Sequence, residues 1–157
     1  MTDLERLLAI EAIRQLKARY FRCMDLKDFD SVAATFAPDA TFGAKSLKSS
    51  SDGASLADFE VTGRDAIMER ITARTRTADI MHHGHMPEIE ITGPDSARGI
   101  FAMESSHWVM ENGQATALVR SFGYYHDTFT RQDGRWQTQT SLLVLVRADV
   151  ERLGPKA

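Results

Sequence analysis

The sequence predicts an α+β fold, in which helices in the first half of the chain are followed by an antiparallel sheet. Two observations lead to this fold class. Apolar side chains recur at helical spacing in the first part of the chain and alternate with a period of two from about residue 80 onward. Asn-Gly and Asp-Gly pairs then divide the second half into runs joined by tight hairpin turns.

The first element expected is a long helix that begins at Thr2. Thr2 and Glu5 have the spacing of a capping box, in which each side chain binds an exposed backbone N–H at the start of the helix. Apolar residues then recur at near-helical spacing and form one stripe: Leu4, Leu7, Leu8, Ile10, Ile13, Leu16, Tyr20 and Met24. The segment therefore predicts an amphipathic helix.

A second, short helix is expected next. Either Asp28 or Asp30 suits its N-terminal cap, and Pro38 is expected to end it because proline cannot continue a helix. One face of this helix is predicted to carry its apolar side chains, Phe29, Val32 and Phe36.

Residues 39–44 predict a short strand in which Phe42 is the buried side chain. Residues 45–57 are rich in Ser, Lys and Gly and contain little that a core would bury. They predict either a mobile loop over the mouth of the domain or a disordered excursion.

A third helix is expected from about Gly63, with Thr62 as its N-cap. Ile67 and Ile71 are predicted to face inward. The helix would end among basic residues that suit the negative end of a helix dipole, Arg74 and Arg76.

Four strands are expected from residue 80 onward, separated by turns at residues 93–95, 111–113 and 133–134. They predict an antiparallel meander. The run 142–146 is apolar on both faces, although an antiparallel sheet usually exposes one face to water. A second covering layer is therefore expected, formed in part by the helices and in part by another subunit. This predicts a homo-oligomer, dimer or trimer, that associates through the outer face of the sheet.

Length and composition predict one domain spanning residues 1–157. Hydrophobic residues make up 43% and charged residues 26%, which is typical of a globular protein. The net charge of −3 gives no basic face for nucleic acid, so nucleic acid is not expected as a partner. The single cysteine, Cys23, excludes an intrachain disulfide and a cysteine-based metal cluster.

The chain is expected to be cytoplasmic. Its early acidic residues, Asp3 and Glu5, do not fit a secretory signal, and no run approaches the roughly 18 apolar residues that cross a bilayer. No glycine-rich phosphate loop, GxSxG elbow or dinucleotide fingerprint is present, so no nucleotide cofactor is expected.

Asp25 is the first candidate for chemistry. It directly follows the apolar stripe of the first helix, within one turn of Tyr20, Phe21 and Met24. A carboxylate against an apolar wall loses hydration, which raises its pKa and makes it a better base near neutral pH. The alternative is an aspartate at a helix end that faces water or caps the next turn.

Three histidines, His82, His83 and His85, form the second candidate, because histidine suits proton transfer near neutral pH. Neighbouring side chains alternate faces on a strand. A three-histidine metal site would therefore need a distortion at Gly84 and a carboxylate from elsewhere. The third possibility is that at least one of these histidines lies on the surface beside a turn.

His107 and Tyr125 are further candidates for the lining of a pocket. His107 shares a strand face with apolar residues and is expected to point toward the core, where a histidine is either structural or functional. Trp108, Glu104 and Ile100 lie on the opposite face, where subunit contact is expected. Tyr125 stands between Tyr124 and His126 midway along the next strand, and its ring either lines a pocket or fills the core.

Nearly the whole chain resembles the SnoaL-like branch of the nuclear transport factor 2-like superfamily. The resemblance is carried by CMDLKDFD, FAPDATF and TGRDAI, followed by MHHGHMPEIEITGPDSA and YHDTFTRQDGRW. It implies a cone, in which a strongly curved sheet wraps the helices around a deep pocket. It also implies relatedness to cofactor-free lyases that use an Asp–His dyad: scytalone dehydratase, hexachlorocyclohexane dehydrochlorinase and bile acid 7α-dehydratase.

The resemblance places the dyad on Asp25 and His82, and further pocket residues on Tyr20 and His107. Strand parity alone would favour His83, because His83 shares a face with two isoleucines in a regular strand. A bulge near Gly84 or Pro87 would reconcile the two assignments.

One position departs from the relatives. Several of them carry an arginine five residues after the tryptophan of the DGxW turn, where it helps to hold an anion, and this chain has Ser141 there. Electrophilic assistance is then expected from His107 or Tyr20, unless the dyad chemistry is altered or absent. The expected function is a lyase or isomerase that needs no cofactor or metal and acts on a small cyclic, aromatic or steroid-like substrate. The rivals are a binding module like an oxygenase β subunit, and a metal enzyme built on the histidine cluster.

Overall fold

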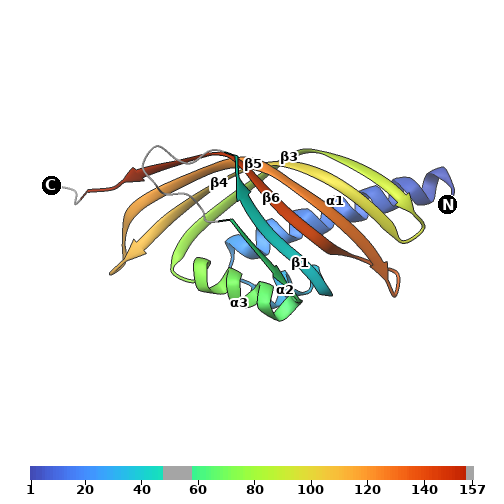
Figure 1. Ribbon diagram of the computed structural model, residues 1–157, viewed down its shortest axis with the longest axis horizontal. Helices are drawn as coiled ribbons and strands as arrows, with labels where there is room; N and C mark the ends of the chain where they lie inside the picture. The colour runs from blue at the N-terminus through green and yellow to red at the C-terminus, as the bar shows by residue number, and fades with distance from the viewer. Residues whose placement is uncertain (48–57, 155–157) are drawn as a thin grey trace.

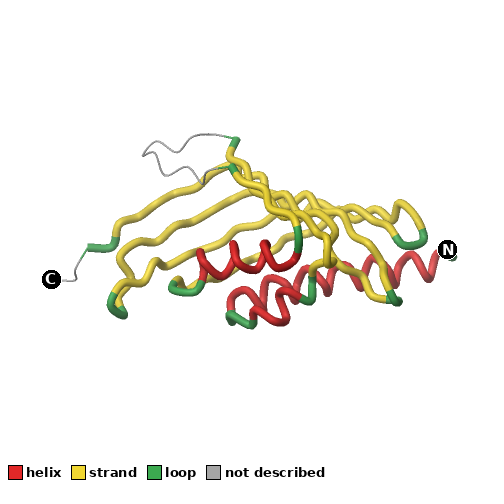
Figure 2. The backbone as a smooth tube through the Cα atoms, turned by 60° about the horizontal axis from the view of Figure 1, so that its bottom comes forward, coloured by secondary structure: helices red, strands yellow, loops and turns green. Residues whose placement is uncertain are grey.

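The computed structural model describes residues 1–47 and 58–154, in which three helices lie on the concave side of a curved six-stranded sheet (Figures 1 and 2). The elements in chain order are α1 (Asp3–Asp25), α2 (Phe29–Ala33), β1 (Phe36–Ser46), β2 (Phe59–Thr62), α3 (Arg64–Thr75), β3 (Ala78–Gly93), β4 (Ser96–Glu111), β5 (Gln114–Gln132) and β6 (Arg135–Arg152). The strand order is β2-β1-β6-β5-β4-β3, and every pair is antiparallel except β1 with β6. This is the α+β cone that the sequence predicts.

The capping box at the start of α1 is confirmed, since Thr2 and Glu5 each accept a bond from the other's backbone N–H. The predicted apolar stripe is correct from Ile10 onward, since Ile10 packs against the core and the later members are buried. At about 3.6 residues per turn, the three early leucines lie on the opposite side of the helix from Ile13, and they are exposed: Leu4, Leu7 and Leu8. The buried face instead includes residues that the stripe omitted: Ala9, Lys17, Phe21 and Cys23.

The second helix is shorter than expected. Asp28, one of the two candidates, is its N-cap and accepts a bond from the backbone of Ser31. The helix ends at Ala33, before Pro38, and Phe36 is the first residue of β1 rather than part of the helix face. Pro38 fits within β1 because the pairing of β1 with β6 is interrupted between Phe36 and Thr41, so its missing N–H costs no sheet bond.

The strand predicted at 39–44 is confirmed but extends to Ser46, so the loop expected from residue 45 begins later. The proposed lid or disordered excursion otherwise falls on residues 48–57, which lie outside the described residues. β2 was not predicted. Its last residue, Thr62, pairs with Thr41, which makes Gly63 the N-cap of α3 in place of the predicted Thr62.

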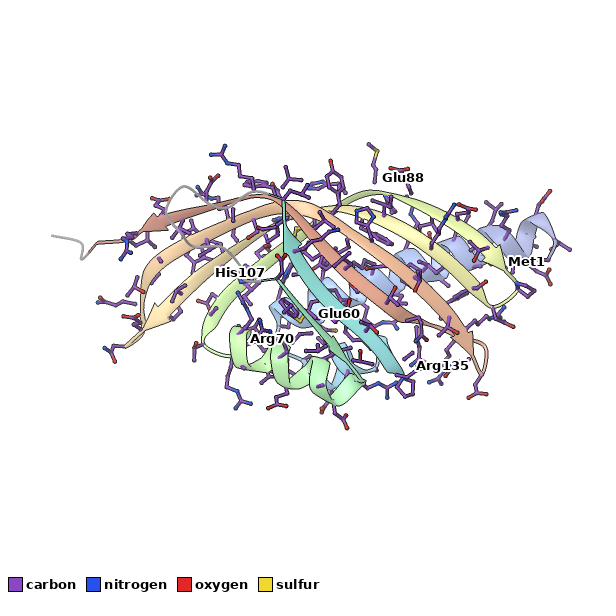
Figure 3. The ribbon with its side chains drawn as sticks, viewed as in Figure 1. Met1, Glu60, Arg70, Glu88, His107 and Arg135 are labelled. Carbon is purple, nitrogen blue, oxygen red and sulfur yellow. The ribbon has the colours of Figure 1, made fainter. Side chains whose placement is uncertain are left out.

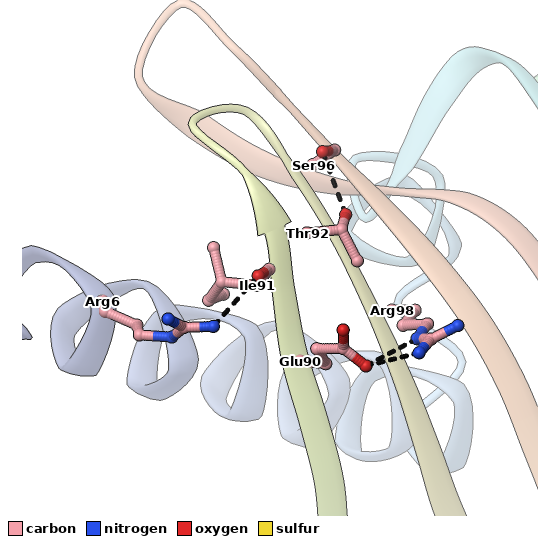
Figure 4. A network of polar contacts seen from close by, with 6 residues as sticks. All are labelled: Arg6, Glu90, Ile91, Thr92, Ser96 and Arg98. Carbon is pink, nitrogen blue, oxygen red and sulfur yellow. Dashed lines mark hydrogen bonds and ion pairs between the residues drawn. The ribbon is translucent and has the colours of Figure 1, made fainter.

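The last four strands form the predicted meander, beginning at Ala78. The two hairpin turns read from Asn-Gly and Asp-Gly are confirmed, because all four of their central residues have positive φ angles: Asn112, Gly113, Asp133 and Gly134. At the first hairpin, Glu90 pairs with Arg98 at 2.6 Å and Thr92 bonds Ser96 (Figure 4). Arg6 of α1 also donates to the carbonyl of Ile91, which ties the start of the helix to β3.

Gly123 lies at a point of close approach between β5 and β6. A Cβ at this position would come 2.3 Å from the carbonyl oxygen of Val144, next to an irregularity in the pairing of the two strands. We expect Gly123→Ala to lower the free energy of unfolding by about 1–3 kcal/mol, because the backbone must shift to admit the methyl group. Urea unfolding followed by tryptophan fluorescence measures this. Gly154→Ala, where the added Cβ meets nothing within 4 Å, is the control; equal midpoints for the two variants would contradict the expectation.

The sequence run 142–146 is divided between the two faces of β6. Leu143 and Leu145 line the concave interior, whereas Leu142 borders a groove on the other side of the sheet and Val146 is 39% exposed. The homo-oligomer expected through this outer face stays a prediction. Among the described residues, no helix combines the length and apolar character needed to cross a membrane.

Candidate active site

Asp25 and His82 meet where the end of α1 faces the start of β3. Nδ1 of His82 lies 2.6 Å from Oδ1 of Asp25, and the backbone N–H of His82 donates to Oδ2 at 3.0 Å. The side chain of His82 is 5% exposed and that of Asp25 is 14% exposed. Because an ionised carboxylate only accepts hydrogen bonds, this contact requires a hydrogen on Nδ1, and in the neutral form of the ring Nε2 then keeps its lone pair.

The position of Asp25 depends on a well-defined end to α1. Lys27 adopts a φ of 58°, and its N–H donates to the carbonyl of Met24. The N–H of Asp28 donates to the carbonyl of Cys23, which completes a Schellman arrangement. Asp25 is therefore held on the last turn of a capped helix, with its carboxylate free to reach β3.

A bulge in β3 determines which histidine points inward. Between His85 and Glu88, β3 contains one more residue than the facing part of β4, because His82 pairs with Ser105 and Glu88 with Ile100. This extra residue brings His82, rather than His83, onto the same face as Ile89 and Ile91. The bulge expected near Gly84 or Pro87 is therefore present, and strand parity alone gives the wrong histidine.

Phe21 holds the imidazole of His82 flat. The two rings are stacked, with centroids 5.5 Å apart and an interplanar angle of 9°. The stacking needs a glycine at position 84, because a Cβ there would come 2.5 Å from the Phe21 ring. Phe21 and the Asp25 carboxylate together fix the plane and the rotation of the imidazole.

The other two histidines of the cluster do not join His82. His83 has a side chain that is 59% exposed, with Nδ1 3.8 Å from Glu104, and His85 is also exposed. In residues 1–47 and 58–154, no three His, Cys, Asp or Glu side chains lie close enough together to hold a metal ion. The distortion at Gly84 that a three-histidine site would need is absent, because β3 pairs regularly with β4 from His82 to His85 and only His82 points inward.

Tyr20 and Tyr125 lie behind the dyad in the core. Their ring centroids are 6.2 Å apart, and the side chains are almost fully buried. Burial raises the pKa of both phenols above the usual value, so both stay protonated near neutral pH and can only donate or accept neutral hydrogen bonds. Tyr125, which the sequence left open between pocket lining and core filling, does both.

The ring of His107 packs edge-to-face against the ring of His82, with the two centroids 5.6 Å apart. Burial lowers the pKa of His107 to about 4, and repulsion from His82 in its protonated form and from Arg74 adds to this shift. The imidazole is therefore neutral at physiological pH and offers a hydrogen bond rather than a charge.

These residues line one cavity of about 230 Å³ inside the cone, between the sheet and α3. His82, His107, Tyr20 and Tyr125 all contribute to its wall, together with Ser105 and further polar and apolar side chains. Asp25 lies outside this wall and borders a wider groove of about 900 Å³ between α1 and β3. His82 contacts both spaces. Its carboxylate partner is thus on the outer side and the cavity on the inner side.

Two features of the site were missed in the sequence. Lys17 and Asp127 form a buried ion pair at 2.7 Å beside Tyr125, and Ser141, the position that departs from the relatives, pairs with Asp127 across β5 and β6. In the sequence, Lys17 stands between Leu16 and Tyr20, two apolar positions of α1. This placement on the buried face could have indicated a buried lysine.

The second missed feature is a pair of arginines on the inner face of α3. Arg70 and Arg74 follow Ile67 and Ile71 at helical spacing, which places all four on one side of the helix. Both arginines line the cavity. Arg74 was expected only to interact with the helix dipole, although its spacing from Ile67 and Ile71 also puts it on the inner face.

The low pKa of His107 predicts how stability depends on pH. The unfolded chain takes up a proton on this residue near pH 6.5, whereas the folded chain does so only near pH 4. Stability is therefore lost as pH falls through this window, by on the order of 1–2 kcal/mol between pH 7 and 5. We expect His107→Asn to lose correspondingly less stability over that range in urea unfolding. An unchanged pH dependence in the variant would contradict this account.

The family to which the chain belongs is identified by a match over most of its length. The family described as SnoaL-like domain matches residues 5–141. The chain belongs to the SnoaL-like family. The resemblance seen in the sequence is thereby confirmed over nearly its whole length.

Solved structures show the same fold for this SnoaL-like protein. A candidate scytalone dehydratase from Novosphingobium aromaticivorans has a TM-score of 0.78 and 21% identity, covering 100% of this chain and 95% of that one. The type 3 hexachlorocyclohexane dehydrochlorinase of Novosphingobium barchaimii has a TM-score of 0.76 and 17% identity, covering 99% and 100%. The β subunit of a candidate aromatic-ring-hydroxylating dioxygenase from N. aromaticivorans has a TM-score of 0.71 and 16% identity, covering 90% and 92%. At these identities the likeness shows the fold alone.

Proposed function

We propose that this SnoaL-like protein is a lyase or isomerase that needs no cofactor, in which Asp25 and His82 act as a proton-transfer dyad on a small cyclic substrate. The observation that carries the proposal is the 2.6 Å bond between Asp25 and Nδ1 of His82, with the imidazole 5% exposed at the wall of the cavity. The bond leaves the lone pair of Nε2 as the base, and the carboxylate stabilises the imidazolium that forms.

In a dehydration, Nε2 of His82 removes a proton from the carbon next to a carbonyl group, and the electron pair of the C–H bond becomes a C=C bond. The C–O bond to a β-hydroxyl group breaks, and the imidazolium returns its proton to the departing oxygen, so that water leaves. Tyr20, Tyr125 and His107 are the neutral donors available to the carbonyl oxygen, where negative charge develops. Without a leaving group, return of the proton to another carbon gives an isomerisation.

A panel of cyclic β-hydroxy-ketones tests the proposal. We expect the protein to form enones, detected by ultraviolet absorbance, and to exchange the acidic C–H into deuterated water, detected by NMR. Both activities should be lost in His82→Ala. Full retention of an activity in His82→Ala would assign that activity to other residues and end the dyad proposal.

A non-catalytic binding role is the second candidate, and it is favoured by Ser141 and by the fold shared with an oxygenase β subunit. In that case ring compounds would bind in the cavity, and neither elimination nor C–H exchange would exceed the rate in buffer.

A further inference from the structure

Two arginines of α3, Arg70 and Arg74, line the cavity, whereas Asp25 does not. Figure 3 shows Arg70 and His107 on the concave side, between the sheet and α3. The guanidinium of Arg70 lies over the Phe59 ring, 4.3 Å from its centroid, which fixes its plane. Arg74 follows one turn later and lines the same cavity. Both cations therefore line the α3 side of the cavity: Arg70 is fixed by Phe59, and Arg74 is more exposed to solvent but close enough for its charge to act on His107.

These charges have no acidic partner in the described part of the chain. The cavity wall contains two arginines and two histidines but neither aspartate nor glutamate. None of the ion pairs within residues 1–47 and 58–154 involves Arg70 or Arg74. Nε of Arg70 is buried and makes no hydrogen bond to any described residue. A buried donor without an acceptor is destabilising, and a bound anion would supply the missing acceptor.

The negative charge of Asp25 and the positive charges of Arg70 and Arg74 lie at different places around the cavity. Asp25 is bonded to His82 from outside the cavity wall, whereas the two arginines line the wall itself and neutral His107 lies beside His82. The charge of Arg74 reaches His107 and contributes to the fall in its pKa, so the field on this side of the cavity is positive. A negatively charged group would be attracted to the arginines and kept away from the Asp25 carboxylate.

We propose that Arg70 and Arg74 form a carboxylate subsite and that the substrate is a small organic acid, bound with its acid group at α3 and its reacting carbon at His82. Binding of a carboxylate by Arg70 and Arg74 is independent of the proposed function. Only the placement of the reacting carbon at His82 rests on that function. The subsite supplies from α3 the anion-binding charge that the chain lacks at Ser141. A guanidinium binds a carboxylate through two parallel hydrogen bonds, which would set the orientation of the ring toward His82.

The volume of the cavity limits the size of the acid. About 230 Å³ lies below the range of about 300–1,000 Å³ that is usual for drug-sized ligands, so a single substituted ring fits better than a steroid. The apolar part of the wall suits such a ring, since it includes Met24, Phe42, Ile71, Met103 and Leu145. The substrate class narrows to monocyclic carboxylic acids.

Benzoate and its neutral isostere benzamide test the subsite by isothermal titration calorimetry, with no turnover required. We expect benzoate to bind the wild type at least about tenfold more tightly than benzamide, because one charged hydrogen-bonded contact is worth about 1.5–3 kcal/mol and tenfold equals about 1.4 kcal/mol. Arg74→Gln and Arg70→Gln should each weaken benzoate about tenfold and leave benzamide unchanged. Arg76→Gln, which removes the same charge from α3 outside the cavity wall, is the matched control and should change neither Kd.

Equal affinity of the wild type for benzoate and benzamide would overturn the subsite, as would the absence of benzoate binding at millimolar concentration or an equal loss of affinity in Arg76→Gln. Circular dichroism of each variant separates loss of binding from loss of folding, and Arg70→Lys, which keeps the charge, should retain part of the preference for benzoate. The proposed function fails separately: benzoate binding that depends on the arginines, without any elimination or C–H exchange, would leave the subsite and remove the dyad. Turnover of neutral hydroxy-ketones that requires His82 but not the arginines would support the dyad and remove the carboxylate subsite.

Discussion

Replacing His82 with alanine is expected to lower kcat/KM for the proposed elimination by roughly 10²–10⁴, the contribution that general acid–base catalysis usually makes. The change removes the only imidazole in the described chain that is bound through Nδ1 to a carboxylate and also lines the cavity. Asp25→Asn is expected to produce a loss of similar order. The amide of asparagine can donate to Nδ1, which would move the imidazole hydrogen to Nε2 and remove the base.

The control for this prediction is His83→Ala. His83 belongs to the same run of histidines, but its side chain is 59% exposed and lies on the other face of β3, so the variant should keep its activity within about twofold. Steady-state kinetics distinguishes loss of the base from loss of substrate binding. Loss of the base lowers kcat, whereas binding through Arg70 and Arg74 leaves KM nearly unchanged. An equal loss in His83→Ala and His82→Ala would mean that β3 has been disturbed rather than a base removed.

Asp127→Asn is expected to lower the free energy of unfolding by about 3–5 kcal/mol, the second large effect. Lys17 and Asp127 are 5% and 0% exposed and form their ion pair inside the core. The ammonium of Lys17 also lies 3.5 Å from the centroid of Tyr125 and close to three further aromatic rings. Without the carboxylate, the chain must bury a lone charge or fold with a neutral lysine, and both are costly. Burial already lowers the pKa of Lys17, against the attraction of Asp127.

A double variant separates charge from packing in this prediction. Lys17→Met combined with Asp127→Leu replaces both partners with apolar side chains, and it should recover most of the lost stability because a buried pair is often no better than a hydrophobic contact of similar volume. Urea unfolding of Lys17→Met, Asp127→Leu and the double variant gives the cycle, with Asp127→Asn measured alongside. A double variant less stable than Asp127→Asn would show that the loss in the single variant was not caused by an unpaired charge.

The sequence predicts most of the fold where a local signal and the tertiary structure agree. The capping box of Thr2 and Glu5 and the turn at Asn112 fix their own backbone geometry and were therefore readable. β2 was not, because its alternation of apolar and polar residues lasts only four positions and its pairing partners come only from β1. Phe36 was assigned to α2 for the same reason: its pairing partner is Thr138, about 100 residues away.

The candidate site was partly accessible from the sequence. The resemblance implied that Asp25 and His82 come together, and the structure has them 2.6 Å apart, but periodicity alone would have selected His83. The bulge that reverses the parity of β3 depends on its pairing with β4 and leaves only an indirect trace, in Gly84 and Pro87. Charged side chains inside the cone were missed altogether, because a lysine or arginine on an apolar helix face more often extends along the surface to reach water.

The most direct test of the account is the tautomer of His82, measured by long-range ¹H–¹⁵N NMR of histidine-labelled protein. The account predicts hydrogen on Nδ1, with a downfield Nδ1–H signal that is protected from solvent and lost in Asp25→Asn, and an Nε2 with the shift of an unprotonated nitrogen. Hydrogen on Nε2 in the wild type, or a ring that exchanges freely with water, would mean that Asp25 does not orient His82 and that the cavity has no base.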